Sequence, residues 1–206
     1  MNNQLIIVGA SGHGKVIADI AKLNGYKDIV FLDDNEQVKI CSGYPVCGTT
    51  KDILKYREYD FVVGIGSNEI RRKIQKLLIS NELNVVSLVH PMAVVAEDVK
   101  IGEGSVVMAG AVINVGSVIG KGCIINTGAT VDHDNSIGDF VHISVGSHLA
   151  GTVKLGNNIM LGAGSVVINN IDICEDCIIG AGAVVTKNVN DKGIYVGVPA
   201  QLIRTR

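Results

Sequence analysis

An aliphatic residue recurs at every sixth position over almost half of the chain. From Val89 to Val185, seventeen consecutive positions spaced by six are Val, Ile or Leu, without one insertion. A period of six fits neither an α-helix, with its 3.6 residues per turn, nor an alternating strand with a period of two. It is typical of a solenoid whose coil has three six-residue faces, in which residue i lies against residue i + 18.

The residues around each repeated position indicate how faces and corners are built. The aliphatic side chain would point into the column, and each face would be a strand of six residues followed by a corner. Four residues later the side chain is usually small or β-branched, as at Ser105, Ala111 and Ser117. Helical crossovers between ordinary parallel strands need about a dozen residues each, for which the repeat leaves no room. We therefore expect a parallel β-helix of almost six coils.

The first 85 residues follow a different pattern, in which strands alternate with helices. Apolar runs at 5–8, 29–32 and 60–65 predict short strands, and residues from about 15 to 23 and from about 69 to 80 predict helices. Such alternation indicates a small parallel sheet covered by helices. We expect two domains: a Rossmann-like α/β unit at residues 1–85, and a β-helix with a C-terminal tail at residues 86–206.

A glycine-rich loop between the first strand and the first helix is a candidate ligand site. The run Gly9-Ala10-Ser11-Gly12-His13-Gly14 would place backbone N–H groups at a helix N-terminus, where phosphate binds. Asp33 and Asp34 end the second strand, where an acidic side chain can bind a sugar or ribose hydroxyl. The glycine order departs from the dinucleotide fingerprint. A nucleotide-linked ligand is therefore favoured over NAD, and a purely structural loop is the remaining alternative.

Composition and charge argue against several classes of protein. The net charge of −2, without a long charged run, disfavours a nucleic-acid-binding face. No apolar stretch approaches the roughly 18 residues of a membrane span, and no signal-peptide pattern is present. Five cysteines without framework spacing favour a reducing cytoplasm. Cys174 and Cys177 have no second Cys/His pair nearby, so we interpret them as corner residues rather than metal ligands.

Three of the five histidines fall on the repeat: His133, His142 and His148. His133 comes two positions after the inward Val131, so its ring should leave the column. The adjacent Asp134 can orient the ring, raise its basicity and stabilise the imidazolium. His142 lies nine residues later on a different wall, so the two rings could meet only across a subunit boundary. Taken alone, one exposed histidine is more often incidental.

Six short segments place the chain beside a known family. They are residues 9–14, 31–34, 65–71, 133–134, 140–142 and 196–200. In this order they resemble the bacterial sugar acetyltransferases related to sialic-acid O-acetyltransferases and to PglD-type UDP-amino-sugar N-acetyltransferases. The resemblance covers nearly the whole chain. It implies a left-handed β-helix and a homotrimer with acetyl-CoA in the groove between neighbouring subunits.

The resemblance also implies a reaction and a set of site residues. An acetyl group would pass from acetyl-CoA to the amine of a UDP-linked 4-amino sugar, in bacterial surface-glycan or glycoprotein-sugar biosynthesis. His133 would be the general base and Asp134 would raise its basicity, at a position where the family often carries Glu. Asn126 is expected near His133 on the same wall, where it would help to position the acceptor sugar. The other implied contacts are His142, Ala163 and Ala181 for acetyl-CoA, and Ser11, Gly12, His13, Asp33, Asp34 and Gly66 for the nucleotide sugar.

Three alternatives stay open. The acceptor could be a hydroxyl, because the local sequence does not separate an amine from a hydroxyl. A zinc lyase of the γ-carbonic-anhydrase kind uses the same column, but the spacing of His133, His142 and His148 lacks its close His pair. A non-catalytic scaffold would leave the His133-Asp134 pair without a task. Direct attack on the thioester is expected, because no Cys or Ser has an evident base beside it.

Overall fold

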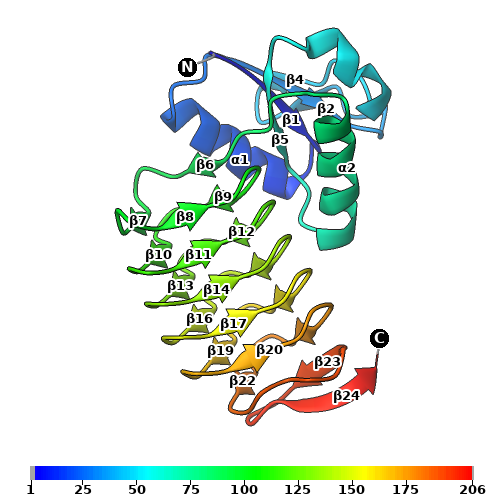
Figure 1. Ribbon diagram of the computed structural model, residues 1–206. Helices are drawn as coiled ribbons and strands as arrows, with labels where there is room; N and C mark the ends of the chain where they lie inside the picture. Colours follow the sequence, from blue (N-terminus) through cyan, green and yellow to red (C-terminus); the bar gives the residue numbers. More distant parts are fainter. Residues whose placement is uncertain (1–2, 206) are drawn as a thin grey trace. The chain divides into compact units, whose positions relative to one another are not determined.

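The computed structural model describes residues 3–205 and divides into two compact units, one up to Pro91 and one from Met92 (Figure 1). The first unit contains a three-stranded parallel sheet in the order β2-β1-β5. The strands are β1 (Gln4–Val8), β2 (Asp28–Leu32) and β5 (Asp60–Val63). Their almost wholly buried side chains explain the short apolar runs in the sequence.

Two helices and several short elements complete this unit. They are α1 (Gly12–Leu23), β3 (Ile40–Cys41), β4 (Tyr44–Pro45), η1 (Thr50–Tyr56), α2 (Asn68–Ser80) and β6 (Leu88–Val89). The β3–β4 hairpin and η1 were not predicted. The expected start of α1 near Lys15 was wrong, because the helix begins at Gly12. A side chain at Gly14 would overlap the carbonyl oxygen of Gly9, so the glycine-rich first turn packs directly against the loop that follows β1.

The second unit is a β-helix whose strands lie on three faces. The first face holds β7 (Val94–Val95), β10 (Val112–Ile113), β13 (Thr130–Val131), β16 (His148–Leu149), β19 (Val166–Val167) and β22 (Val184–Val185). The second face holds β8 (Lys100–Ile101), β11 (Val118–Ile119), β14 (Ser136–Ile137), β17 (Lys154–Leu155) and β20 (Asp172–Ile173). The third face includes β9 (Val106–Val107), β12 (Ile124–Ile125), β15 (His142–Ile143), β18 (Met160–Leu161) and β21 (Ile178–Ile179). It continues into β23 (Gly193–Val196) and the antiparallel β24 (Gln201–Thr205).

The register confirms the eighteen-residue coil. Each strand of a face pairs in parallel with the strand one coil later, as in the pairing of Ile113 with Val131 and of Val131 with Leu149. Ile113 and Val131 are fully buried, and Leu149 is nearly so. The prediction of six-residue strands was wrong, since each paired segment has two residues. The other four residues of each hexad turn the corner, where Asp134 takes a left-handed φ of 57°.

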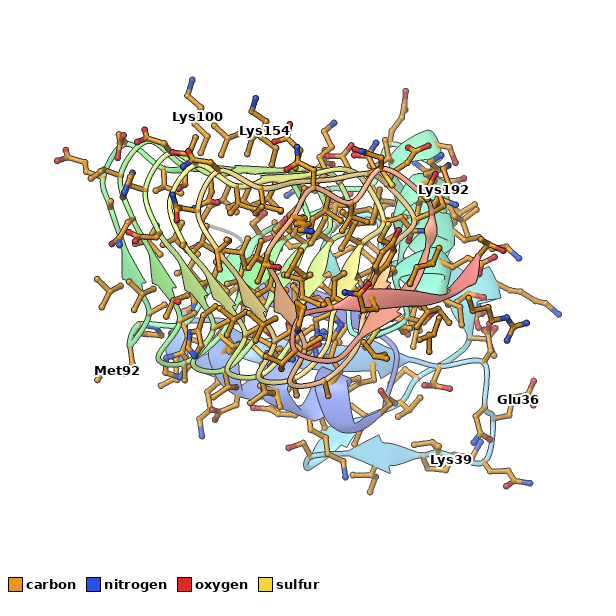
Figure 2. The ribbon with its side chains drawn as sticks, turned by 90° about the horizontal axis from the view of Figure 1, so that it is seen from below. Glu36, Lys39, Met92, Lys100, Lys154 and Lys192 are labelled. Carbon is orange, nitrogen blue, oxygen red and sulfur yellow. The ribbon has the colours of Figure 1, made fainter. Side chains whose placement is uncertain are left out.

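The outward side chains differ between the faces. On the second face they are Lys100, Val118, Ser136, Lys154 and Asp172, and Figure 2 shows the two lysines projecting from the same side of the column. On the first face they are Val94, Val112, Thr130, His148, Val166 and Val184. On the third face the corresponding positions are Val106 and Ile124, both buried within the single chain, and then His142, Met160 and Ile178, which are at least partly exposed. One face of the β-helix is therefore mainly polar, and two are mainly apolar.

Candidate active site

The corner after β13 carries an imidazole bound to a carboxylate. The chain turns outward after Val131, and the side chain of His133 is 53% exposed, as expected from the repeat. Its Nδ1 lies 2.8 Å from Oδ2 of Asp134. This hydrogen bond, aided by the charges of Asp132 and Asp134, raises the pKa of His133. A neutral ring that donates from Nδ1 carries its lone pair on Nε2, which is then available to accept a proton.

Two glycines leave the space that the side chains of His133 and Asp134 occupy. Gly151 lies one coil after His133, and a Cβ there would be 2.6 Å from both Cε1 and Nε2 of the ring. Gly116 lies one coil before Asp134, and a Cβ there would be 2.5 Å from Oδ1 of the carboxylate. Neither glycine was expected from the sequence to belong to the site. The spacing of eighteen between each glycine and its partner is the signal that could have found them.

Asp132 adds a second negative charge beside the ring. Its Oδ1 accepts hydrogen bonds of 2.8 Å from Nδ2 of Asn114 and from the backbone N–H of His133. These bonds lower the pKa of Asp132, with the Asn114 contact as the larger cause. The carboxylate is therefore ionised near neutral pH, which favours the protonated form of His133.

His142 lies on β15 of the third face, whereas His133 follows a strand of the first face, as predicted. Nδ2 of Asn126 donates to Nε2 of His142 at 3.1 Å. The expectation that Asn126 lies near His133 on the same wall was therefore wrong. Asn126 directly follows β12, which pairs with β15, so the stacking of coils brings it to His142 instead.

Ala163 and Ala181 occupy equivalent corners after β18 and β21, on the same face as His142. Both are exposed and lie one coil apart. Within residues 3–205, neither of their N–H groups has a backbone acceptor, although the neighbouring Gly164 and Gly182 donate to the preceding coil. This edge of the column therefore carries exposed residues whose N–H groups could bind the carbonyl groups of a ligand.

The predicted sugar-binding residues lie in loops that follow the carboxyl ends of β1, β2 and β5. Ser11 is the N-cap of α1, but its side chain makes no capping hydrogen bond. Gly12 and His13 form the first turn of this helix. Apart from its chain neighbours and the backbone of its own helix, no atom lies within 4 Å of a Cβ built on Gly12. The N-terminus of α1 therefore presents N–H groups beside open space, a favourable environment for an anion.

Asp33 and Asp34 hold the loops around this helix end. Oδ2 of Asp33 accepts from the N–H of Ala10 at 2.6 Å, and Oδ1 of Asp34 accepts from both N and Oγ1 of Thr50 at 2.8 Å. Gly66 follows β5 and, like Gly12, has no atom within 4 Å of a Cβ built on it. Ser11, Asp33 and Gly66 thus follow three adjacent strands, as ligand-binding residues commonly do in open α/β sheets.

A hollow of about 390 Å³ adjoins Asp33 in the same unit. Its lining includes apolar side chains, Val38 and Val46, and charged ones, Glu36 and Lys39, which Figure 2 labels. The volume is within the roughly 300–1,000 Å³ of small-molecule sites. The hollow is large enough for part of a nucleotide.

Family models match both units. The PglD N-terminal domain model matches residues 4–78, and the bacterial transferase hexapeptide model (six repeats) matches residues 152–187. Two curated relatives are each 36% identical, an uncharacterised protein of Acanthamoeba polyphaga mimivirus over 101 residues and the UDP-N-acetylbacillosamine N-acetyltransferase of Bacillus subtilis over 110. The matches span 20% and 50% of the length of these relatives and about half of this chain.

Solved structures match almost the whole chain. The acetyltransferase domain of PglB from Neisseria gonorrhoeae, in complex with acetyl coenzyme A, is 40% identical, with a TM-score of 0.95 and coverage of 98% of this chain and 100% of that one. The chain belongs to the PglD-type hexapeptide-repeat sugar acetyltransferases. PerB from Caulobacter crescentus, in complex with CoA and GDP-perosamine, is 37% identical, with a TM-score of 0.93 and coverage of 97% and 96%.

Membership of this PglD-type family confirms the predicted fold class, a Rossmann-like unit followed by a hexapeptide β-helix. In residues 3–205, no three or more His, Cys, Asp or Glu side chains gather as metal ligands would. Over the same residues, no helix has the length and hydrophobicity needed to cross a membrane.

Proposed function

We propose that the chain transfers an acetyl group from acetyl-CoA to the amine of a nucleotide-linked amino sugar. One observation carries the proposal: the outward His133 ring is bound through Nδ1 to Asp134, so that Nε2 is left as a proton acceptor. The names of the relatives support both the donor and the class of acceptor. We propose a UDP-linked 4-amino-4,6-dideoxy-N-acetylhexosamine as the acceptor, in line with the Bacillus relative.

The proposed chemistry is one direct attack. The attacking species is the neutral amine, because an ammonium ion has no lone pair, and the protonated fraction releases its extra proton to solvent before it reacts. As the neutral nitrogen bonds to the thioester carbon it becomes positively charged, and one of its protons moves to Nε2 of His133, a transfer that suits a base with a pKa near 7. The tetrahedral oxyanion then collapses, the carbon–sulfur bond breaks, and the proton is returned to the CoA sulfur. Asp134 stabilises the imidazolium that forms between these two transfers.

Acetyl-CoA is proposed to bind along the edge that carries His142, Ala163 and Ala181. His142 would contact the thioester region, and Asn126 would hold the His142 ring through its hydrogen bond of 3.1 Å. The N–H groups of Ala163 and Ala181 would bind the amide carbonyls of the pantetheine arm. The acetyl-CoA and CoA in the structures of relatives support this choice of ligand.

The nucleotide sugar is proposed to bind at the carboxyl ends of the strands in the first unit. The N–H groups at Gly12 and His13 would bind the diphosphate, and Ser11 Oγ, without a capping bond, could join them. Asp33, Asp34 and Gly66 would bind the remainder of the nucleotide. GDP-perosamine in the PerB structure supports a nucleotide sugar as the substrate class.

The active form is proposed to be a homotrimer, in which the apolar first and third faces of neighbouring columns pack together. Such packing would let His133 of one subunit approach His142 of the next.

Sedimentation should give the mass of three chains. Val94→Glu on the first face should weaken the trimer, because its side chain is 63% exposed in a single chain. Lys154→Glu on the polar second face is the control, and equal dissociation by both variants would contradict this packing.

The function is tested by mixing the protein with acetyl-CoA and a panel of UDP- and GDP-linked amino sugars. Free CoA thiol should appear only with an amine acceptor, and mass spectrometry should show one added acetyl group. Counterparts with a hydroxyl in place of the amine are the control. Acetylation of those sugars instead would identify an O-acetyltransferase, and no release with any acceptor would favour a non-catalytic scaffold.

Asp134→Asn should change the pH dependence of the reaction. Only the unprotonated ring accepts a proton, so kcat/KM rises as the pH increases through the pKa of His133. Because Asp134 raises this pKa above its ordinary value of 6.5, the wild-type acidic limb should lie above pH 6.5. In the variant the limb should move to lower pH and the plateau should fall, because the base is weaker. Asparagine tolerates the left-handed φ of 57°, so the corner should be retained. An unchanged limb in the pH–rate profile would contradict the role of Asp134.

A further inference from the structure

Buried polar side chains join successive coils at several corners of the column. Ser105 Oγ donates to the carbonyl of Gly120 at 2.8 Å and accepts from the N–H of Cys123 at 2.9 Å. Ser117 and Ser147 donate in the same way to carbonyls fifteen residues further along the chain. All three serines are almost fully buried. Each hydroxyl therefore links two coils and satisfies backbone groups that would otherwise be costly to bury.

Asn135 occupies the equivalent position at the corner of His133, and it is the single amide among these positions from Ser105 to Ala183. It is 1% exposed. Its Nδ2 donates to the carbonyl of Ala150 at 3.1 Å, and its Oδ1 accepts from the N–H of Val153 at 2.9 Å. The amide thus makes both hydrogen bonds that a serine makes at this position.

The second N–H of this amide reaches back to the turn that carries the imidazole. Nδ2 lies 2.6 Å from the carbonyl oxygen of Asp132 and 3.3 Å from that of His133. These carbonyls belong to the two peptide groups on either side of the His133 Cα. Holding both peptide planes fixes φ and ψ at His133, and with them the direction in which its side chain leaves the backbone.

We infer that Asn135 is a positioning residue for His133, which it orients through the two flanking carbonyls. This inference rests on the proposed function, in which His133 is the base. The Asp132 carbonyl has a second donor, Ser117 Oγ at 2.8 Å, and the His133 carbonyl has a second donor in the N–H of Thr152 at 2.9 Å. A catalytic group needs such support, because a displacement of about 1 Å can cost about 10²-fold in rate.

Asn135→Ser is the variant that separates positioning from column stability. A serine can keep the links to Ala150 and Val153, as Ser105 does at its own corner, but it has no second N–H for the turn of His133. We expect kcat to fall by at least about tenfold while KM for acetyl-CoA stays near the wild-type value. Ser105→Ala is the matched control, since it removes a corner link without touching this turn. It should lower the melting temperature and leave kcat unchanged.

The titration of His133 supplies a readout that needs no acceptor sugar. The charged groups facing the ring are Asp134 and Asp132, and the coils on either side place Asn114, Gly116 and Gly151 at this corner, none of which titrates. In Asn135→Ser the pKa of His133, followed by NMR, should fall towards its ordinary value as the bond to Asp134 loosens. This measurement can succeed even if the proposed acceptor is wrong, so the two failures are distinguishable.

Two outcomes would overturn the inference. One is an Asn135→Ser protein with the wild-type kcat and the wild-type His133 titration. The other is a Ser105→Ala protein that loses as much kcat as Asn135→Ser, which would show a structural role alone. Circular dichroism is recorded first. If Asn135→Ser does not fold, Asn135→Thr is measured instead, since its hydroxyl can make the same two links between coils and likewise has no N–H for the turn of His133, and the same two outcomes apply to it.

Discussion

Replacing His133 with alanine should lower kcat by roughly 10²–10⁴, the contribution of a positioned general base. The loss should fall on kcat rather than on KM for acetyl-CoA, because the proposed CoA-binding residues lie on the third face. The fold should be retained, since the side chain is 53% exposed and its hydrogen bond is to the still more exposed Asp134. Steady-state kinetics and thermal melting measure the two effects.

His148→Ala is the matched control for this variant. His148 is also an exposed histidine on the column, hydrogen-bonded through Nδ1 to Oγ1 of Thr130 at 2.9 Å, but no carboxylate is paired with it among the described residues. Because His148 lies on the first face, sedimentation first checks that the variant is still a trimer. As a trimer it should keep most of the wild-type kcat. If His133→Ala and His148→Ala turn over equally well, His133 is not the base.

Gly151→Ala should lower kcat by about 10²-fold without unfolding the protein. The added methyl would lie 2.6 Å from Cε1 and Nε2 of His133, so the imidazole ring must move out of its present position against Gly151. A displacement of about 1 Å at a catalytic group is enough for a loss of this size. Gly151 is buried, but the ring above it is exposed and can move, so the free energy of unfolding should fall by only about 1 kcal/mol.

A double variant shows whether the methyl acts through the ring. In the His133→Ala background the ring that the methyl displaces is gone, so adding Gly151→Ala should have little further effect on kcat. Full additivity of the two losses would mean that Gly151 acts on the reaction by another route. Urea unfolding of all four proteins checks that stability is not the cause.

The architecture could be predicted in detail because one side-chain period specifies it. The spacing of six determined which residues point inward, and the coil of eighteen determined their neighbours. The same arithmetic placed His133 outside the column and on a different face from His142. Local secondary-structure propensities seldom override such a repeat, because every hexad adds one more buried aliphatic side chain to the core of the column.

The local details could not be read from the period. How many residues of each hexad pair as a strand depends on the corner conformation, in which residues such as Asp134 adopt left-handed φ values. The hydrogen bond of Asn126 depends on where its amide points, and the neighbouring coil offered His142 as the partner. In the first unit, tertiary packing at Gly14 overrode the weak helix propensity of a glycine-rich segment and moved the start of α1 to Gly12.

The residues that surround His133 could be predicted only in part. Once His133 is selected as the base, the repeat places Gly151 one coil away from it, but a glycine in a sequence does not by itself indicate a role in catalysis. Asn135 is similar, because a buried amide at a corner gives no sign in the sequence of which carbonyls it holds. These residues become meaningful only when the path of the backbone is known.

The stacking of identical coils also restricts how genes for such columns can change in length. Gain or loss of eighteen residues leaves each remaining side chain on its original side and moves the rest of the column by about 4.8 Å. Gain or loss of one residue within the regular part instead moves the downstream aliphatic residues out of the interior. Insertions and deletions that survive should therefore come in whole coils, or as loops extruded at the corners.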